Sequence, residues 1–152
     1  MDLTAALPLL LPRAVAWVEA QAQSCLAFGV PLSDPGVALA RSVGVRNPGS
    51  IRLGVVQTLP MPDDPELREA AIQTGLLSPG MVGLTLGYAV FLCRGHDADP
   101  RLLSHEFRHV HHYEAAGSIG LFLPIYLSQV VQFGYLNAPY EQDARAHERD
   151  SA

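Results

Sequence analysis

Charged residues are scarce in this sequence, at 16% of 152 residues, while apolar residues reach 49%. A chain this apolar is unlike a disordered chain, and its length suits one globular domain with a hydrophobic core. The formal net charge of −5 supplies no basic surface of the kind that binds nucleic acid. We therefore expect a single domain over residues 1–152 and no nucleic-acid partner.

Cysteine is also rare. Cys25 and Cys93 are the two cysteines of the chain, and they are far apart in sequence. They lack the CxxC spacing that a thiolate metal clip or a redox pair requires. We expect both to be buried thiols.

The sequence gives little sign of membrane insertion or secretion. The N-terminal "MDLTAALPLLLPR" has no basic segment before its leucines, and Pro8 and Pro12 interrupt the apolar run. We expect no signal peptide and a cytoplasmic location. The apolar stretch 118–136 is close to the length that spans a bilayer. Polar residues within it favour a core helix, although a membrane-associating segment is the alternative: Ser128, Gln129 and Gln132.

An Asp-Pro dipeptide occurs three times, at Asp34, Asp64 and Asp99. Aspartate can cap the free N–H groups of a helix, and proline suits the first helical position. With the spacing of apolar residues, these signals predict helices over 11–28, 35–43, 65–74, 100–115 and 121–134, and another after Pro139. Two runs are strand-like, 50–59 and 83–95. The second run could be one long strand or a hairpin that bends at Gly87-Tyr88.

The expected fold class is therefore α+β, mostly helical, with a small β-sheet that precedes the helix over 100–115. The N-terminal part, about 1–48, is expected to be helical, and the remaining core covers about 50–148.

The segment "LLSHEFRHVHHYEAAG", residues 102–117, holds four of the six histidines. Successive residues of a helix are about 100° apart, so His105 and His109 project from one stripe, one turn apart. Two imidazoles in this arrangement can share a metal ion. The alternative is a polar helix face that is merely rich in histidine. The same projection places Ser104, Arg108, His111 and His112 on a solvated face.

Glu106 decides between these alternatives. It projects into the apolar arc of the helix, where an unpaired carboxylate costs several kcal/mol. An HExxH zinc site explains its position, because His105 and His109 would hold Zn²⁺ while Glu106 acts as the general base on the metal-bound water.

A catalytic zinc needs a third protein ligand. The segment "APYEQDARAHE" offers Glu141, Asp143, His147 and Glu148. Glu141 is favoured, because it lies in the first turn of a short helix that Pro139 would open. Asp143 is an alternative partner for an imidazole N–H, or a surface residue. Glu148 shares the helix face of Glu141, so one of the two could bind zinc while the other lies at a solvated end, and Glu141 is the favoured ligand.

Three segments of the chain together resemble a known family. "LLSHEFRHVHHYE", followed by "FLPIYLSQVVQFGY" and "APYEQDARA", resembles small gluzincin-type zinc metallopeptidase domains. The likeness covers about residues 50–148, including "IRLGVVQTLPMP" and "GLTLGYAVFLCRG" as strands of the sheet. It implies a zincin-like fold, with His105, His109 and Glu141 as zinc ligands and Glu106 as the base. A peptide substrate is expected to pair with the strand nearest the site.

The expected function is therefore hydrolysis of peptide bonds in a peptide or protein substrate. The alternative is a catalytically silent, zinc-stabilised module that binds a peptide or a protein. The residue that stabilises the tetrahedral oxyanion stays open among Tyr113, Tyr135, Tyr140 and His112. His96, on the loop before the histidine helix, is expected to be a solvated loop residue.

Overall fold

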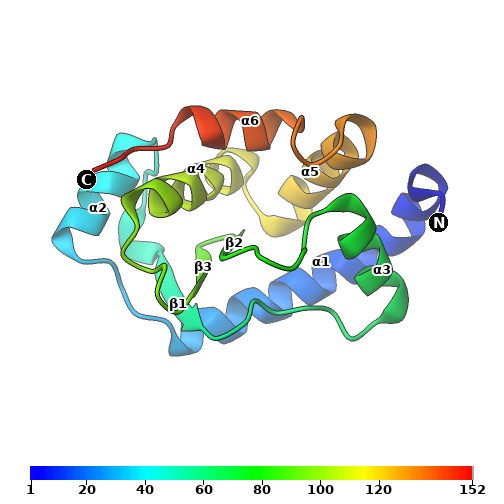
Figure 1. The fold of residues 1–152 in the computed structure, drawn as a ribbon, viewed down its shortest axis with the longest axis horizontal. Coiled ribbons are helices and arrows are strands. Elements are labelled where there is room, and N and C mark those ends of the chain that lie inside the picture. The colour runs from blue at the N-terminus through cyan, green and yellow to red at the C-terminus, as the bar shows by residue number, and fades with distance from the viewer. Residues whose placement is uncertain (152) are drawn as a thin grey trace.

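The structure of the protein is a computed structural model that describes residues 1–151. These residues form a helical domain around one small sheet, which confirms the α+β class (Figure 1). The helices and strands, in chain order, are α1 (Leu3–Phe28), α2 (Asp34–Ser42), the 3₁₀ turn η1 (Pro48–Ser50), β1 (Arg52–Val56), α3 (Pro65–Thr74), β2 (Gly83–Leu86), β3 (Ala89–Cys93), α4 (Pro100–Ala116), α5 (Ile119–Phe133) and α6 (Pro139–Ala146).

The sheet has the strand order β1-β3-β2, with β1 parallel to β3 and β2 antiparallel to it. The run 83–95 is therefore a hairpin bent at Gly87-Tyr88. Gly87 has φ +68°, whereas Tyr88, like every described residue other than glycine, has a negative φ. A two-residue hairpin turn with a positive φ only at its first residue is of type II′, which favours glycine there. The sheet leaves β2 as an edge strand beside α4.

Helices cover both faces of the sheet. Figure 1 shows the strands between α1 and α4. Side chains alternate along β3, so Phe91 joins a core under α1 and α5, while Val90 and Leu92 join a second core under α2 and α4. Phe107 and Val110 anchor α4 in that second core and are fully buried. The histidine helix is thereby held firmly against the sheet.

Helix α1 is longer than the sequence suggested. It was expected over 11–28, and it begins at Leu3, with Pro8 and Pro12 inside it. A proline within a helix removes the hydrogen bond to the carbonyl four residues earlier. Both prolines are exposed, so the freed carbonyls can face water, while Leu10 on the opposite side is buried. Asp2 caps the helix through the N–H of Ala5.

Two of the three Asp-Pro dipeptides cap helices as expected. Asp64 accepts from the N–H groups of Glu66 and Leu67, and Asp99 accepts from that of Arg101. The third differs, because Ser33 caps α2 and Asp34 is its first residue. The expectation of buried cysteines holds for one of the two: Cys25 is fully buried, whereas Cys93 is half-buried.

The apolar segment 118–136 packs into the core as expected, but along one side only. It contains α5, in which Phe122, Leu123 and Val130 are buried, whereas Leu121 and Ile125 are exposed. By length and composition α1 could span a membrane, and α4 with α5 could do so only as one pair bent by 116°. Core helices of soluble proteins and signal sequences meet the same criteria, so this finding does not decide the location.

Candidate metal centre

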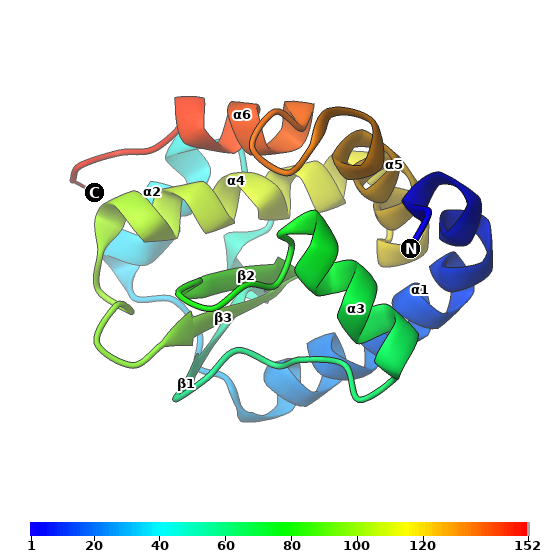
Figure 2. The ribbon, with the colours of Figure 1, turned by 45° about the vertical axis from the view of Figure 1, so that its right-hand side comes forward.

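Two helices bring the candidate ligands together. Helix α4 carries His105 and His109 one turn apart, and Figure 2 shows α6 lying along α4. Pro139 opens α6, which places Glu141 in its first turn, next to the two imidazoles. The fold therefore joins residues that are more than thirty positions apart in sequence.

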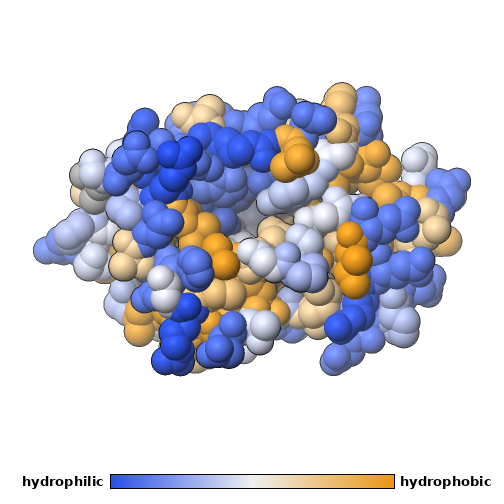
Figure 3. All heavy atoms as spheres, in the orientation of Figure 1, coloured by the Kyte–Doolittle hydropathy of each residue, from blue (hydrophilic) through white to orange (hydrophobic). Residues whose placement is uncertain are grey.

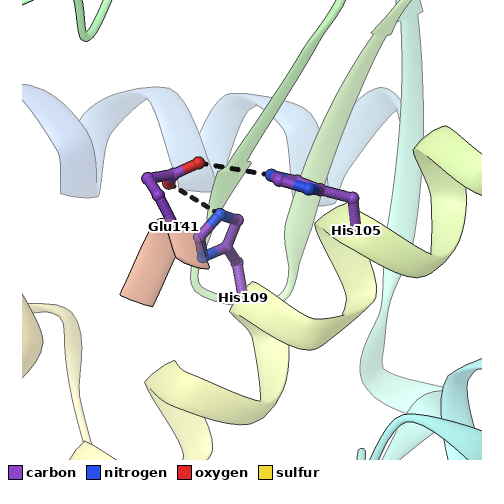
Figure 4. Close-up of side chains that lie close together, drawn as sticks. All are labelled: His105, His109 and Glu141. Carbon is purple, nitrogen blue, oxygen red and sulfur yellow. Dashed lines mark hydrogen bonds and ion pairs between the residues drawn. The ribbon is translucent and has the colours of Figure 1, made fainter. Parts of the chain in front are cut away.

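The three side chains converge on one point (Figure 4). Nε2 of His105 lies 3.3 Å from Oε1 of Glu141, and Nε2 of His109 lies 2.8 Å from Oε2 of the same carboxylate. One ligand atom from each of the three residues lies within 4.8 Å of the others. Glu141 is 2% exposed and His109 is 7% exposed, so this convergence lies inside the protein rather than on its surface.

His105 is held between two carboxylates. Its Nε2 faces Glu141, and its Nδ1 lies 2.9 Å from Oε2 of Glu148, just beyond the end of α6. Burial alone would lower the pKa of the imidazole, but the hydrogen bond to Glu141 and the charge of Glu106 raise it to about 9. Glu148 is therefore not at a solvated end, as the sequence suggested, but is a partner of a candidate ligand.

His109 is held from its other side by a second histidine. Its Nδ1 lies 3.3 Å from Nδ1 of His112, whose Nε2 lies 2.6 Å from Oδ2 of Asp143. Burial lowers the pKa of His112 to about 4, although Asp143 opposes this shift. Arg108 also donates to Oδ2 of Asp143, at 2.8 Å. Asp143 thus reaches the centre through His112 and does not touch a candidate ligand itself.

The carboxylate of Glu141 is fixed by a tyrosine. Tyr126 Oη, on α5, donates to Oε2 of Glu141 at 2.8 Å. Burial would raise the pKa of Glu141, but hydrogen bonds from His105 and His109 outweigh it and bring the pKa far below its ordinary value. Glu141 is therefore a carboxylate, which is the form that binds a cation.

Glu106 lies beside this group but outside it. It is 6% exposed, as its inward projection from α4 predicted, and its Oε1 accepts from Thr85 Oγ1 on β2 at 2.7 Å. At Gly83, a Cβ would lie 3.0 Å from Oε2 of Glu106, so glycine leaves room for this carboxylate next to the strand. Glu106 is thus a buried carboxylate held next to the three converging side chains.

The donor set suits zinc. Two imidazole nitrogens and one carboxylate oxygen are common zinc ligands, and bond lengths of about 2.0–2.1 Å in a tetrahedron separate ligand atoms by roughly 3.3 Å. The separations of 3.3 and 2.8 Å, one to each oxygen of Glu141, lie at this spacing and somewhat below it. The second nitrogens also have partners, with a carboxylate behind His105 and an imidazole behind His109, as metal-bound histidines usually have.

Some site expectations fail. Ser104 and His112 were placed on a solvated face, but Ser104 is fully buried and His112 is 6% exposed. The reason is that a second layer covers this side of α4. The backbone N–H of Arg149 donates to Ser104 Oγ, and α6 supplies the aspartate that meets His112. His111 stays on the outer side and contacts the carbonyl of Gly44.

Of the remaining candidates, Tyr113 and Tyr135 line the same cavity as the three converging side chains, whereas His96, His147 and Tyr140 do not. His96 is exposed on its loop, as expected. The Nδ1 of His147 lies 2.8 Å from the carbonyl oxygen of Asp143. Tyr113 stacks on Phe122 in the core, and Tyr140 stacks on His112.

Two residues that contact the site carboxylates were not predicted from the sequence. Thr85 carried a weak signal, because it is a polar residue within the apolar strand segment "GLTL". Tyr126 carried none, since nothing in "FLPIYLSQ" shows which side of α5 will face Glu141. Both depend on packing between elements that are distant in sequence.

Comparison with known proteins yields no relative. This chain matches no family model, no curated protein and no solved structure.

Proposed function

We propose that the protein is a zinc-dependent metallopeptidase of the gluzincin type. The observation that supports this most strongly is the convergence of His105, His109 and Glu141 from two helices, with the buried carboxylate of Glu106 beside them. A structural histidine cluster would not need this acid, and Glu106 is not among the groups that could hold the ion.

Each residue then has a separate task. Zinc bound by His105, His109 and Glu141 would polarise a water molecule and a substrate carbonyl. Glu106 takes the proton of the attacking water and delivers it to the leaving amine. Thr85 orients Glu106 by its hydrogen bond to Oε1, which leaves the other carboxylate oxygen available for the proton.

The free edge of β2 suits the backbone of a peptide substrate. The two-residue turn pairs Leu86 with Ala89 and Leu84 with Phe91, and the N–H of Cys93 donates to the carbonyl of Val82. In an antiparallel ladder the residues between such pairs direct their backbone groups away from the partner strand. Gly83 and Thr85 therefore direct backbone groups toward the outer edge of the sheet, next to Glu106. Both residues are buried, so an extended peptide that adds as a strand would have to enter the cavity that they line.

Tyr113 and Tyr135 are the oxyanion candidates that line the cavity, and we favour Tyr135 because Tyr113 is buried against Phe122. Tyr135 follows α5 and lines the same cavity as His105, Glu106 and Glu141. Burial and the charge of Glu141 raise its pKa above the ordinary value, so its hydroxyl stays protonated and can donate a hydrogen bond.

Substitution Glu106→Gln tests the proposal. The amide cannot accept the proton, so we expect peptidase activity against a mixed peptide library to fall at least a hundredfold, while zinc content stays the same. Glu19→Gln, at an exposed position on α1, is the matched control and should keep full activity. Equal activity of the Glu106→Gln protein and the wild type would refute the role of the base.

A zinc-stabilised binding module is the second candidate. Helix α6 is only eight residues long and has no side-chain N-cap, so a metal joining it to α4 would contribute strongly to its stability. This candidate predicts bound zinc, a large loss of thermal stability on chelation, and no hydrolysis of any peptide in the library.

A further inference from the structure

A cavity adjoins the candidate metal centre. Its volume is about 170 Å³, and His105, Glu106, His109 and Glu141 form one part of its lining. Figure 3 shows the surface hollowed near the middle of this face, between α4 and β2. The centre thus opens onto an internal space as well as onto the strand edge.

The rest of the lining is largely apolar and comes mainly from four elements: α1, α3, β2 and α5. Helix α1 contributes Leu7, Leu10 and Ala14, and α3 contributes Ala70 and Ala71. Helix α1 precedes the segment 50–148 that resembles a peptidase domain. The part of the cavity wall that α1 forms is therefore a feature of this chain that the resemblance does not imply. Apart from His105, Glu106, His109 and Glu141, no charged residue of the described chain lines the cavity.

The size of the cavity indicates what it can hold. A cavity of about 150 Å³ lined by apolar side chains accepts a benzene molecule. This one is slightly larger, and its alanines at 14, 70 and 71 leave space that leucines would fill. A phenyl or isobutyl group fits, whereas a charged group would be desolvated with no partner beyond the metal centre.

The peptide-binding edge lies along the same space. Gly83, Leu84, Thr85 and Leu86 of β2 all line the cavity, and Gly83 and Thr85 also direct backbone groups toward the outer edge of the sheet. A peptide paired with this edge would enter the cavity and direct every second side chain toward one side of the strand. The occupant that fits both features is a side chain of an extended peptide.

We propose that this cavity selects substrates with a large apolar side chain, branched aliphatic or aromatic, next to the bond that is cut. This inference rests on the proposed function and specifies its substrate class.

Binding of single amino-acid hydroxamates to the zinc-loaded protein tests it. The hydroxamate group binds the metal in every member of the series, so differences in affinity report on the side chain. Each buried methylene strengthens binding about fourfold. We expect the leucine and phenylalanine compounds to bind at least tenfold more tightly than the alanine compound, and those of lysine and glutamate no more tightly than alanine. Equal affinities across the series would overturn the proposal.

Filling the cavity provides a matched pair of variants. Ala14 lines the cavity, and Ala16, two residues later on α1, is exposed. Ala14→Leu should remove the advantage of the phenylalanine compound and leave binding of the alanine compound unchanged. Ala16→Leu should change neither, and an unchanged preference in Ala14→Leu would contradict the proposal. If Ala14→Leu does not fold, Ala71→Leu fills the space from α3.

Two further measurements separate this proposal from the proposed function. Acetohydroxamate has no side chain, so its binding reports on the metal centre alone. A protein that takes up zinc and binds acetohydroxamate, but shows no side-chain preference, overturns the cavity proposal and keeps the metal centre. A protein that takes up no zinc overturns the proposed function, and the peptide assignment with it. In the metal-free protein, toluene should shift the NMR signal of the Ala14 methyl group and not that of Ala16.

Discussion

Nδ1 of His109 lies 3.3 Å from Nδ1 of His112 in the interior of the protein. One of these nitrogens must donate and the other accept. Nε2 of His112 lies 2.6 Å from the Asp143 carboxylate, which can only accept, so His112 carries its proton there and accepts at Nδ1. His109 then donates from Nδ1. Its Nε2, which points at Glu141, is the nitrogen left for a metal, and a metal binds there once the proton shared with Glu141 has left.

This arrangement predicts the effect of Asp143→Asn. The amide can donate to His112 and thereby reverse the proton positions along the pair, so we expect zinc affinity to fall by roughly 10- to 100-fold. Competition with a chromophoric chelator measures this change. Asp150→Asn removes the same charge from an exposed side chain and serves as the control. ¹⁵N shifts of the two imidazoles report the proton positions directly, and an unaltered pattern in Asp143→Asn would contradict the argument.

Proton release on zinc binding should reveal the state of His105. Both of its nitrogens face carboxylates, and its pKa is raised to about 9, so the metal-free protein carries an extra proton there at neutral pH. Zinc can bind Nε2 only after that proton leaves. We expect about one proton released per zinc at pH 7, and an affinity that rises with pH until about pH 9. Calorimetry in buffers of different ionisation enthalpy measures it, and a pH-independent affinity between about pH 6 and 9 would be the opposite result.

The pH dependence of stability should be affected by Glu114. Its carboxylate accepts from the N–H groups of Arg46 and Asn47 and from Tyr88 Oη, at 2.8 to 2.9 Å. Burial raises the pKa of Glu114, but these hydrogen bonds outweigh it and lower the pKa below 4.5. The stabilisation is therefore present above about pH 4.5 and is lost as the pH falls through the lower value.

Glu114→Gln should accordingly lower the free energy of unfolding by about 1–3 kcal/mol at pH 7, and by progressively less in acid. Chemical denaturation at a series of pH values measures this. Glu69→Gln, at an exposed position on α3, should show no comparable loss. A difference that stays constant down to about pH 3 would argue against the assignment.

Fractionation of cells tests the expectation that the protein does not associate with membranes. One side of α1 contributes Leu10, Val18, Ala22 and Cys25 to the interior, so that side packs within the domain, although only 11% of the most apolar window of the helix is buried. We expect the protein in the supernatant after lysis without detergent and ultracentrifugation. Recovery in the membrane pellet would favour a role for α1 or α5 at a lipid surface.

The local features of the site were predictable from the sequence, because they depend on short-range geometry. HExxH spacing on a capped helix predicts that His105 and His109 share a side, and Pro139 predicts that Glu141 lies in a first turn. The bend at Gly87 was predictable for the same reason. What these features share is that each involves residues within a few positions of one another.

The surroundings of the site were not predictable in this way. A helical projection of α4 treats its polar side as solvated, but α6 and the residues after it cover that side and bury Ser104 and His112. The roles of Tyr126 and Glu148 follow from the same packing. The cavity is likewise formed by side chains of helices that meet only in the folded protein, and Pro8 and Pro12 were misjudged because their exposure was unknown.

Metal content is the most direct test of the central claim. We predict one equivalent of zinc in protein purified without chelators, measured by mass spectrometry. Glu141→Gln should bind zinc far more weakly than Glu19→Gln, which leaves the three candidate ligands intact. Well under one equivalent of zinc in the wild-type protein, with no uptake from added zinc and no change in unfolding temperature, would contradict the account.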